Sequence, residues 1–407
     1  MSKKVLIVGS GASAYTVAQV LSRDENLEIF VAPGNDAVRE FATVVDIREH
    51  SVQELLEFVL ENDISLTVVT SKSDRNDIAN VFQANNQNIF CPTKASSAIC
   101  DSKILGKKFM HQNSIPCPKF AVFDKPNFAY SYLESASFPV VIKTEYHQKK
   151  GIGICNNISS ARSFIENAFD EKRILIEDYI WGHEFSFYVM TDGYQAIPLG
   201  CVATYKYELE GNGGMMSSGM GAFSDNYKIS NKLKEKIMRQ IVNPTLESLA
   251  NSQKPYVGIL GVDLIVDSQE KLYTVEFNSF LKSPDAQVVL ELLDDNLYDL
   301  FESCAIGAFA DDYARIKVKD EHAVSCVLCA GEKAEKIEGL DELDEDTFVA
   351  HNNTKKVDNH YETSAGRTLI LTRKSKVLSR AIKDLYEEVD IVNYSGKKYR
   401  KDIGTII

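Results

Sequence analysis

Residues 258–280 of this 407-residue chain read GILGVDLIVDSQEKLYTVEFNSF. Two runs of strand-forming residues flank the polar turn 267–271, which predicts a β-hairpin. On such a hairpin Asp263 and Glu276 can face each other, and Glu276 and Asn278 point to the same side because side chains alternate along a strand. Three oxygen donors on one sheet face suit one or two magnesium ions that bridge nucleotide phosphates. We therefore predict a metal site made of Asp263, Glu276 and Asn278.

The same three polar residues have a plainer interpretation. In this interpretation they are solvated positions on a hairpin, because antiparallel sheets often have one face exposed to water. The position of Asp263 weighs against this interpretation, because it interrupts an otherwise apolar run, where an unpaired carboxylate would be costly to bury. The metal site is the preferred interpretation.

Length, composition and charge exclude several classes of protein. At roughly 100 to 200 residues per domain, a chain of this length predicts about three or four packed units. The formal net charge of −13 disfavours a non-specific nucleic-acid binder, so a phosphate site needs local positive charge. No stretch of about 18 uncharged apolar residues occurs, which predicts that nothing spans a membrane.

The first residues and the cysteines predict the compartment. Residues 1–13 hold only a short apolar run before the first glycine, which favours a buried strand over a signal peptide. The eight cysteines are scattered singly apart from Cys326 and Cys329, which lie in the apolar run AVSCVLCAG. That setting favours a buried strand over a metal or redox motif. We expect a cytoplasmic protein without a disulfide framework.

The patterns along the chain predict a multidomain protein of the α/β and α+β classes. Up to residue 92, short apolar runs alternate with helix-period segments, which predicts a doubly wound parallel sheet. The expected helices are at 14–21, 52–61, 76–84, 102–112, 159–167, 232–250 and 378–386. Strands at 138–143 and 173–179 and a glycine-rich loop at 208–221 are also expected. The four predicted parts are an N-terminal α/β domain at 1–99, a central domain at 100–117 and 191–312, a lid subdomain at 118–190, and a C-terminal α+β domain at 313–407.

Candidate phosphate ligands follow the strand that ends at residue 143. Lys143 closes this strand beside a loop, where a cation is well placed to hold nucleotide phosphates. The loop 147–153, HQKKGIG, combines positive charge with glycines that let the backbone approach an anion. Further on, Glu177 and Glu184 are candidates to accept hydrogen bonds from an adenine amino group and a ribose hydroxyl. Each of these residues, taken alone, is more often an ordinary surface residue.

Gly9, Ser10 and Gly11 follow the first strand and open a helix. This is the shape of a dinucleotide fingerprint, in which N–H groups at a helix N-terminus accept an anion. The second strand ends in Ala32-Pro33-Gly34 rather than in the acid that would hold a ribose, so a nicotinamide site is disfavoured. A tight strand-to-helix turn and a site for a small anionic substrate are equally supported.

The ordered set of motifs resembles the ATP-grasp family and, within it, the glycinamide ribonucleotide synthetases. The motifs are Ser102-Lys103, Val141-Ile142-Lys143, Ile176-Glu177, Gly182-His183-Glu184, 218–222, Glu276-Phe277-Asn278 and 400–404. The resemblance implies an ATP cleft between two lobes, with ATP and Mg²⁺ or Mn²⁺ as cofactors. It implies Lys103 and Lys143 at the phosphates, Glu177 near adenine and Glu184 near ribose. Together with the loop, the residues that we expect at the nucleotide are Lys103, Lys143, Lys150, Gly151, Glu177, Asp178 and Glu184.

The substrate side departs from the pattern of these synthetases. Their Arg-Glu-His run is replaced by Ser13-Ala14-Tyr15, their Asp-His-Lys-Arg segment keeps only Lys206, and an expected arginine is missing from 279–285. Losing a bidentate partner of a carboxylate or phosphate is not a conservative change. Lys282 or Arg367 is expected to supply a replacement charge. We thus expect Gly9, Ser10, Gly11, Lys282 and Arg367 at the substrate, and Lys143, Lys206 and Arg367 in catalysis.

These features predict an ATP-dependent carboxylate–amine ligase. A substrate carboxylate attacks the γ-phosphate, and an amine then displaces phosphate from the acyl phosphate, so that ADP and phosphate are released. The loops 149–153 and 208–221 are expected to close over the reactants and exclude water. We expect small-molecule substrates, a monomer or homodimer, and no nucleic-acid or membrane partner.

Three functions remain open at this point. The changed substrate residues favour an acid and an amine other than the standard purine substrates. The alternative is an authentic phosphoribosylamine–glycine ligase of purine biosynthesis. A non-catalytic nucleotide-binding protein is disfavoured by the complete set of metal-binding candidates.

Overall fold

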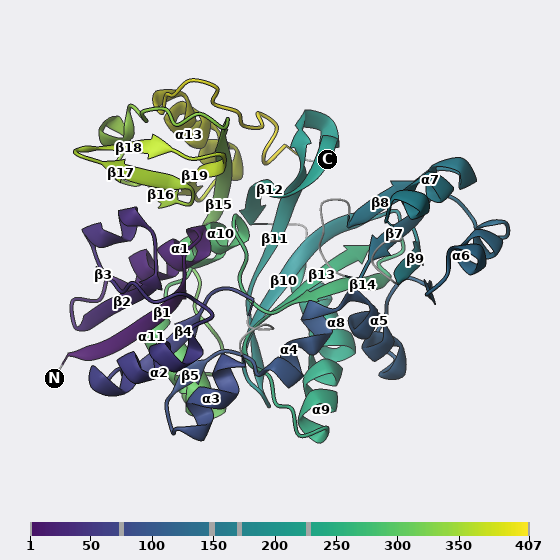
Figure 1. The fold of residues 1–407 in the computed structure, drawn as a ribbon, viewed down its shortest axis with the longest axis horizontal. Coiled ribbons are helices and arrows are strands. Elements are labelled where there is room, and N and C mark those ends of the chain that lie inside the picture. Colours follow the sequence, from purple (N-terminus) through teal and green to yellow (C-terminus); the bar gives the residue numbers. More distant parts are fainter. Residues whose placement is uncertain (1, 73–76, 146–150, 169–172, 225–228, 406–407) are drawn as a thin grey trace.

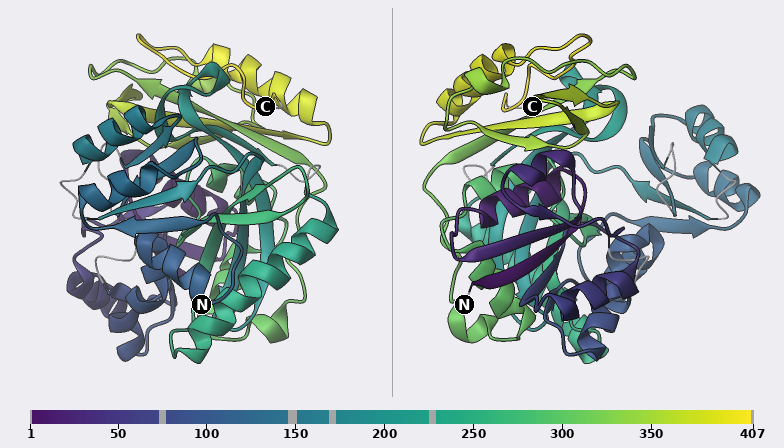
Figure 2. Two further views of the ribbon diagram at one scale, coloured as in Figure 1. Left: turned by 90° about the vertical axis from the view of Figure 1, so that its right-hand side faces the viewer. Right: turned by 60° about the vertical axis from the view of Figure 1, so that its left-hand side comes forward.

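The computed structural model describes residues 2–72, 77–145, 151–168, 173–224 and 229–405. These residues form sheets of five, eight and four strands and a two-stranded ribbon, with helices packed around them (Figure 1). Figure 2 shows the four-stranded sheet and its helices projecting as a separate lobe.

The N-terminal residues fold as the predicted parallel sheet. Its elements are β1 (Lys3–Gly9), α1 (Ala12–Leu21), β2 (Leu27–Pro33), β3 (Thr43–Val44), α2 (Val52–Glu61), β4 (Leu66–Val69), α3 (Ile78–Ala84) and β5 (Ile89–Phe90). The strand order is β3-β2-β1-β4-β5. Val5 and Ile7 pack in the same core as α1, whereas Leu6 and Val8 pack with α2 and α3. Helices therefore cover both faces, as expected of a doubly wound unit.

The projecting lobe is built on an antiparallel sheet of four strands. Its elements are β6 (Phe120–Phe123), α6 (Pro126–Leu133), β7 (Val140–Thr144), β8 (Ile152–Cys155), α7 (Ile158–Ala168) and β9 (Ile174–Asp178). The strand order is β6-β9-β7-β8, and α6 and α7 pack with it around a small apolar core. This core holds β7 and β9, which carry Lys143 and Glu177, side by side.

An antiparallel sheet of eight strands forms the centre of the molecule. Its first five strands in the sequence are β10 (His183–Asp192), β11 (Ala196–Leu209), β12 (Gly213–Ser224), β13 (Val257–Val266) and β14 (Leu272–Asn278). The C-terminal strands β15 (His322–Ala330), β16 (Phe348–His351) and β19 (Gly366–Ser375) extend the same sheet. The order is β14-β13-β10-β11-β12-β15-β19-β16. The C-terminal α+β part is thus joined to the centre by hydrogen bonds of the sheet itself.

Helices and a short ribbon complete the fold. They are α4 (Lys94–Asp101), α5 (Lys103–Gln112), α8 (Asn231–Ile237), α9 (Asn243–Asn251), α10 (Asp285–Glu291), α11 (Leu297–Ala305), α12 (Phe309–Asp312), β17 (Thr354–Val357), β18 (His360–Thr363) and α13 (Leu378–Ile391). One core cluster joins β1 and α1 to α10, α11, β15 and β19. The N-terminal and C-terminal parts therefore pack around α10 and α11.

Two expected elements differ in the structure. The predicted loop at 208–221 is wrong, because β11 runs to Leu209 and β12 begins at Gly213, so the segment is the end of a long hairpin. The glycines that suggested a loop serve its turn: Gly211 has φ 63° and Gly214 has φ 78°, values that favour glycine. The predicted helix at 232–250 is divided into α8 and α9 by a π-helical turn at Met238–Val242.

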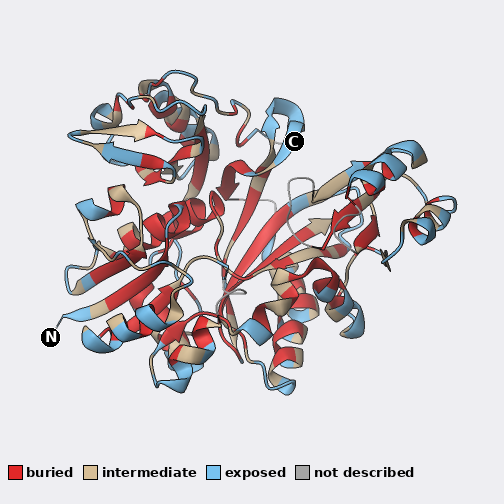
Figure 3. Cartoon of the chain, in the orientation of Figure 1, coloured by how far each residue is buried: buried red, intermediate tan, exposed pale blue. Residues whose placement is uncertain are grey.

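Buried residues are concentrated in the middle strands of the two larger sheets (Figure 3). Cys326 in β15 is fully buried and Cys329, near the end of the same strand, is half-buried, in agreement with the buried-strand interpretation. Within the described ranges, no helix is both long enough and apolar enough to cross a membrane.

Candidate active site

The predicted hairpin is present, and its two carboxylates stand opposite each other. β13 and β14 pair antiparallel, with Asp263 opposite Glu276 and Gly261 opposite Asn278. The register shifts directly after Asp263. Asp263 is fully buried, whereas the Glu276 side chain keeps 26% of its surface exposed.

Asp263 is surrounded by groups that stabilise its negative charge. Its Oδ1 accepts a hydrogen bond from Ser186 Oγ at 2.6 Å. Lys282 Nζ lies 3.2 and 3.0 Å from the two carboxylate oxygens, and Lys206 Nζ lies 3.3 Å from Oδ2. Burial alone would raise the pKa of Asp263, but the two ammonium groups outweigh it and lower the pKa to about 2. The apolar run therefore buries a paired charge and not an isolated one.

Lys206 lies between two acids. Its Nζ donates to Glu184 Oε1 at 2.6 Å and to Asp263. Burial would lower the pKa of Lys206, but Asp263 and Glu184 raise it well above its ordinary value. This lysine is a fixed cation and is unsuited to act as a base.

Glu177 binds two lysines in the interior. Lys143 Nζ lies 2.9 Å from Oε2 and Lys107 Nζ lies 3.2 Å from Oε1, and all three side chains are at most 4% exposed. Burial raises the pKa of Glu177, but Lys143 and Lys107 outweigh it and lower the pKa overall. Lys103 pairs in the same way with Glu276 at 2.9 Å. Lys103 and Lys143, both expected at the phosphates, are thus each held by a carboxylate.

Lys107 belongs to this cluster although the sequence did not single it out. It lies one helical turn after Lys103 on α5, and its Nζ also donates to the Thr274 carbonyl at 2.9 Å. A spacing of four residues places two side chains on one face of a helix, and this is the signal that could have found it. Of the loop residues expected at the phosphates, Lys150 lies outside the described residues, and Gly151 directly precedes β8.

A large cleft opens between the four-stranded lobe and the central sheet. Its volume is about 890 Å³, and Lys143, Glu177, Asp178, Glu184, Lys206 and Glu276 are among its lining residues. Apolar side chains such as Ile152 and Ile154 line the lobe side. Trp181, the only tryptophan of the chain, also lines the cleft and is 72% exposed. The cleft thus combines an apolar wall with a charged floor, which suits a nucleotide.

The residues of the predicted metal site fit a divalent cation. Asp263 and Glu276 stand opposite each other, and Asn278, two residues after Glu276 on β14, would offer its Oδ1, because its buried Nδ2 is a hydrogen-bond donor and cannot ligate a cation. In the ranges that the structure describes, no three His, Cys, Asp or Glu side chains are grouped so as to hold a metal by themselves. A cation here would need Asn278 and nucleotide oxygens to complete its ligands, which is the usual way that Mg²⁺ binds.

The turn at Gly9, Ser10 and Gly11 contacts the C-terminal part of the chain. The N–H of Ala12, at the start of α1, donates to Asn352 Oδ1 at 2.9 Å, and Ser10 Oγ donates to Glu49 Oε1 at 2.8 Å. A Cβ on Gly9 would lie 2.2 Å from Thr70 Oγ1, so this close approach requires glycine. These contacts favour the tight-turn interpretation. Asn352 Oδ1 already accepts the hydrogen bond of the Ala12 N–H, and the Glu49 carboxylate beside Ser10 would repel an anion.

Arg367 stands at a junction of three segments. Its Nη1 donates to the carbonyls of Ser218, Gly219 and Ser283 at 3.3, 3.3 and 3.0 Å. Its own carbonyl accepts from Asn352 Nδ2 at 2.8 Å. Asn352, which the sequence did not single out, therefore links the turn before α1 to Arg367. Lys282 is separate from this junction and belongs to the Asp263 cluster.

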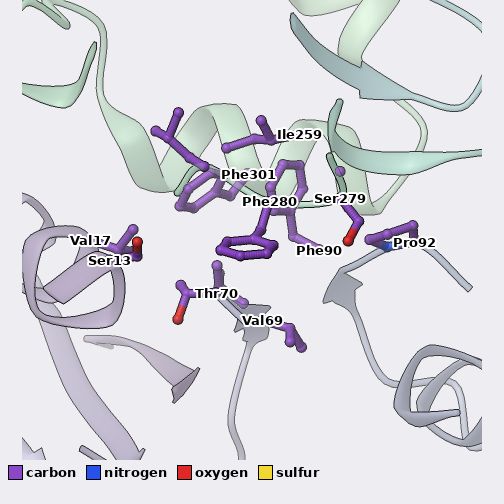
Figure 4. A pocket seen from close by; sticks show the side chains of 13 residues that line it. Ser13, Val17, Val69, Thr70, Phe90, Pro92, Ile259, Ser279, Phe280 and Phe301 are labelled. Atoms are coloured by element: carbon purple, nitrogen blue, oxygen red, sulfur yellow. The ribbon is translucent and has the colours of Figure 1, made fainter. Parts of the chain in front are cut away.

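A small cavity lies between the carboxyl end of β4 and the loop after β14. Phe280 projects into it from this loop, with Thr70 on one side and Phe301 on the other (Figure 4). Its volume is about 20 Å³, roughly the room that a single water molecule needs. In this conformation Phe280 and its neighbours leave no space for a sugar phosphate.

Family models cover most of the chain. The N domain, ATP-grasp (A) domain and C domain of phosphoribosylglycinamide synthetase match residues 3–99, 101–286 and 330–406. The phosphoribosylamine–glycine ligase of Halalkalibacterium halodurans is 31% identical over 98% of this chain and 96% of its own length. The chain belongs to the phosphoribosylglycinamide synthetase family. The ligase of Clostridium acetobutylicum is 29% identical over 98% of this chain and 99% of its own length.

Solved structures show the fold of this family. The phosphoribosylamine–glycine ligase of Thermotoga maritima superposes with a TM-score of 0.84 at 22% identity, covering 98% of this chain and 99% of that one. The biotin carboxylase domain of a Hydrogenobacter thermophilus 2-oxoglutarate carboxylase, solved with MgADP, has a TM-score of 0.74 at 16% identity and covers 97% and 91%. The predicted ATP-grasp fold is confirmed.

Membership of the phosphoribosylglycinamide synthetase family also bears on the predicted function. It confirms the predicted class, an ADP-forming carbon–nitrogen ligase. The prediction of non-standard substrates receives less support than its alternative, because relatives that match the chain from end to end are named phosphoribosylamine–glycine ligase. The changed residues at 279–285 had suggested the opposite, and a local change in a motif carries less weight than similarity over the whole chain.

Proposed function

We propose that this protein is a phosphoribosylamine–glycine ligase. It would use ATP to activate the carboxylate of glycine as an acyl phosphate and join it to the amine of phosphoribosylamine, with release of ADP and phosphate. The observation that carries the proposal is the match to a relative named phosphoribosylamine–glycine ligase, which extends over 98% of this chain and 96% of the relative. The charged cleft supports the ATP half of the reaction.

The side chains of the cleft have separate tasks in this proposal. Lys103 and Lys143 would exchange their ion pairs with Glu276 and Glu177 for contacts that neutralise phosphate charge. Lys206 would remain a cation between Glu184 and Asp263. Asp178 and Glu184 would lie beside the nucleoside. Magnesium held by Asp263, Glu276 and Asn278 would supply Lewis-acid stabilisation of the phosphoryl group. The lobe that carries β7 and β9 would exclude water, which otherwise hydrolyses an acyl phosphate.

A second candidate is a ligase for another acid and amine. The 20 Å³ cavity at Phe280 and the occupied donor at Ala12 are the observations that favour it. In either case Lys282 and Arg367 would supply positive charge near the substrates. A cytoplasmic location, a monomer or homodimer, and the four predicted domain ranges are part of the same proposal.

ADP release in the presence of Mg²⁺ and ATP tests both candidates. Turnover that requires glycine and phosphoribosylamine together is expected from the first. Turnover only with another pair from a panel of amino acids and amines would replace it with the second. Glu276→Gln should abolish turnover in both cases, and Lys333→Met, at an exposed position, should not.

A further inference from the structure

The end of the β11–β12 hairpin carries cleft residues but lacks a regular ladder. Tyr205, Lys206 and Tyr207 of β11 line the cleft. The pairing with β12 shifts register between Tyr205 and Tyr207 and again between Tyr207 and Leu209. The next strand, β15, pairs with β12 only at Gly221–Phe223, farther from the turn. The conformation of Lys206 therefore depends on support from outside the hairpin.

Arg400, near the C-terminus, supplies contacts to this hairpin. Its side chain is fully buried. Nη1 donates to the Tyr207 carbonyl at 3.0 Å and to Asn212 Oδ1 at 3.1 Å. The guanidinium carbon lies 4.7 Å from the centre of the Tyr205 ring. One side chain thus contacts the residues on both sides of Lys206 and the turn of the hairpin.

Asp402 fixes the guanidinium from the other side. Its Oδ1 and Oδ2 accept from Nε and Nη2 of Arg400 at 2.7 and 2.6 Å, a bidentate pair. Oδ2 also accepts from the N–H of Gly211 at 3.0 Å. The N–H of Lys401 donates to Glu210 Oε1 at 3.3 Å. Because a bidentate pair restricts both orientation and distance, the segment 400–402 holds the turn in one place.

The segment 400–405 is itself anchored to the C-terminal part of the chain. Tyr386 on α13 donates to the Arg400 carbonyl at 2.9 Å and accepts from the N–H of Ile403 at 3.0 Å. Ile403 is fully buried against Gly221, where a Cβ would lie 2.6 Å from Ile403 Cδ1. Figures 1 and 2 show the C-terminal end of the chain close to the hairpin. The support therefore comes from a separate, well-packed part of the molecule.

We propose that Arg400 is a positioning residue for the nucleotide cleft. Through Tyr207, Asn212 and Asp402 it holds the hairpin so that Lys206 reaches Glu184 and Asp263. The inference rests on the proposed binding of ATP in the cleft. A displacement of about 1 Å in a positioning element can cost roughly 100-fold in rate, so a contact that does not touch the nucleotide can still control how it binds.

Two variants of the full-length protein test this role. Arg400→Lys keeps the charge but loses the planar guanidinium, which binds Asp402 and the hairpin at the same time. Asn212→Ala removes one side-chain hydrogen bond and preserves the tail, with a small added strain in the turn, because Asn212 has φ 59°, a conformation that asparagine adopts more readily than alanine. Calorimetric titration with MgADP should show a Kd raised by about 10- to 100-fold in Arg400→Lys, as expected for lost hydrogen bonds to a charged group, and by less in Asn212→Ala. Arg380→Lys, on the exposed side of α13, is the matched control and should bind as the wild type does.

A double-mutant cycle with Lys206→Met separates positioning from a general loss of structure. If Arg400 acts through Lys206, the effects of Asn212→Ala and Arg400→Lys on Kd should largely disappear in the Lys206→Met background. Effects that add independently would overturn the inference, as would wild-type affinity in both single variants. If Arg400→Lys does not fold, Asn212→Ala completes the cycle alone. Failure of the wild type to bind MgADP would contradict the proposed function instead.

Discussion

Lys282 and Asp263 form an ion pair that joins β13 to the loop after β14, with Nζ 3.0 Å from Oδ2. Asp263 is buried and Lys282 is one of its two cationic partners, the other being Lys206. Burying a carboxylate without such partners would cost several kcal/mol. The pair therefore makes it possible for an acid to stand in the middle of an apolar strand beside Glu276.

Replacing Lys282 by methionine should lower stability in a pH-dependent way. The depressed pKa of Asp263, about 2 against 3.8, contributes stability that is present above pH 3.8 and is lost as pH falls through 2. With one cation removed, we expect the unfolding free energy at neutral pH to fall by about 1 to 3 kcal/mol. The difference from the wild type should shrink on acidification, measured by urea unfolding. Lys333→Met is the control, and a difference that does not change with pH would contradict the assignment.

Glu291→Gln should destabilise the joint between the N-terminal and C-terminal parts. Glu291 on α10 is 3% exposed and pairs with Arg23, just after α1, and with Lys374 on β19 at 2.8 Å. Removing the carboxylate breaks both ion pairs, but Arg23 and Lys374 are 45% and 24% exposed and stay solvated, so the cost in urea unfolding should be about 1.5 to 3 kcal/mol. Glu302→Gln breaks the exposed pair with Lys3 and should cost about 1 kcal/mol or less. Equal effects of the two variants would refute this account.

Local patterns predicted much of the fold and part of the site. The pairing of Asp263 with Glu276 followed from strand alternation and a short turn, because both act over a few residues. The junction of Asn352 with Ala12 joins residues 340 positions apart, and the sheet pairing of β12 with β15 sets Gly221 opposite Cys326, more than 100 positions away. No local periodicity encodes such contacts. The hairpin at 208–221 was missed because its glycines indicate a turn but do not give the length of the strands beside it.

The buried His351 should make the free energy of unfolding fall as the pH is lowered from neutral to mildly acidic. It is buried between Tyr15 and Tyr361, and its Nδ1 lies 2.9 Å from Thr354 Oγ1. Burial lowers its pKa from 6.5 to about 4, with Glu40 opposing and Lys356 adding to the shift. Stability from this group is present above pH 6.5 and is lost as pH falls toward 4. We expect about 2 kcal/mol of loss from pH 7 to pH 5. His351→Gln should lack this component in urea titrations, whereas His360→Gln, at a more exposed position, should retain it.

Trp181 should report nucleotide binding directly. It is the only tryptophan, lies in the link between β9 and β10, and lines the cleft beside Tyr179, with ring centres 4.8 Å apart. Because the side chain is 72% exposed, its emission should be close to that of an indole in water, and a ligand that covers the ring should shift the emission to shorter wavelength or quench it. Titration with MgADP should give a saturable change whose midpoint agrees with calorimetry.

The variant Trp181→Phe separates the signal from the binding. It should lose the fluorescence change while its calorimetric Kd stays within about threefold of the wild type, because an exposed rim residue contributes little to affinity. Tyr194→Phe, at an exposed position outside the cleft, should leave both readouts unchanged. Calorimetric saturation with no change in the emission of the wild type would show that the nucleotide does not reach the link at 179–182, and would place it elsewhere in the cleft.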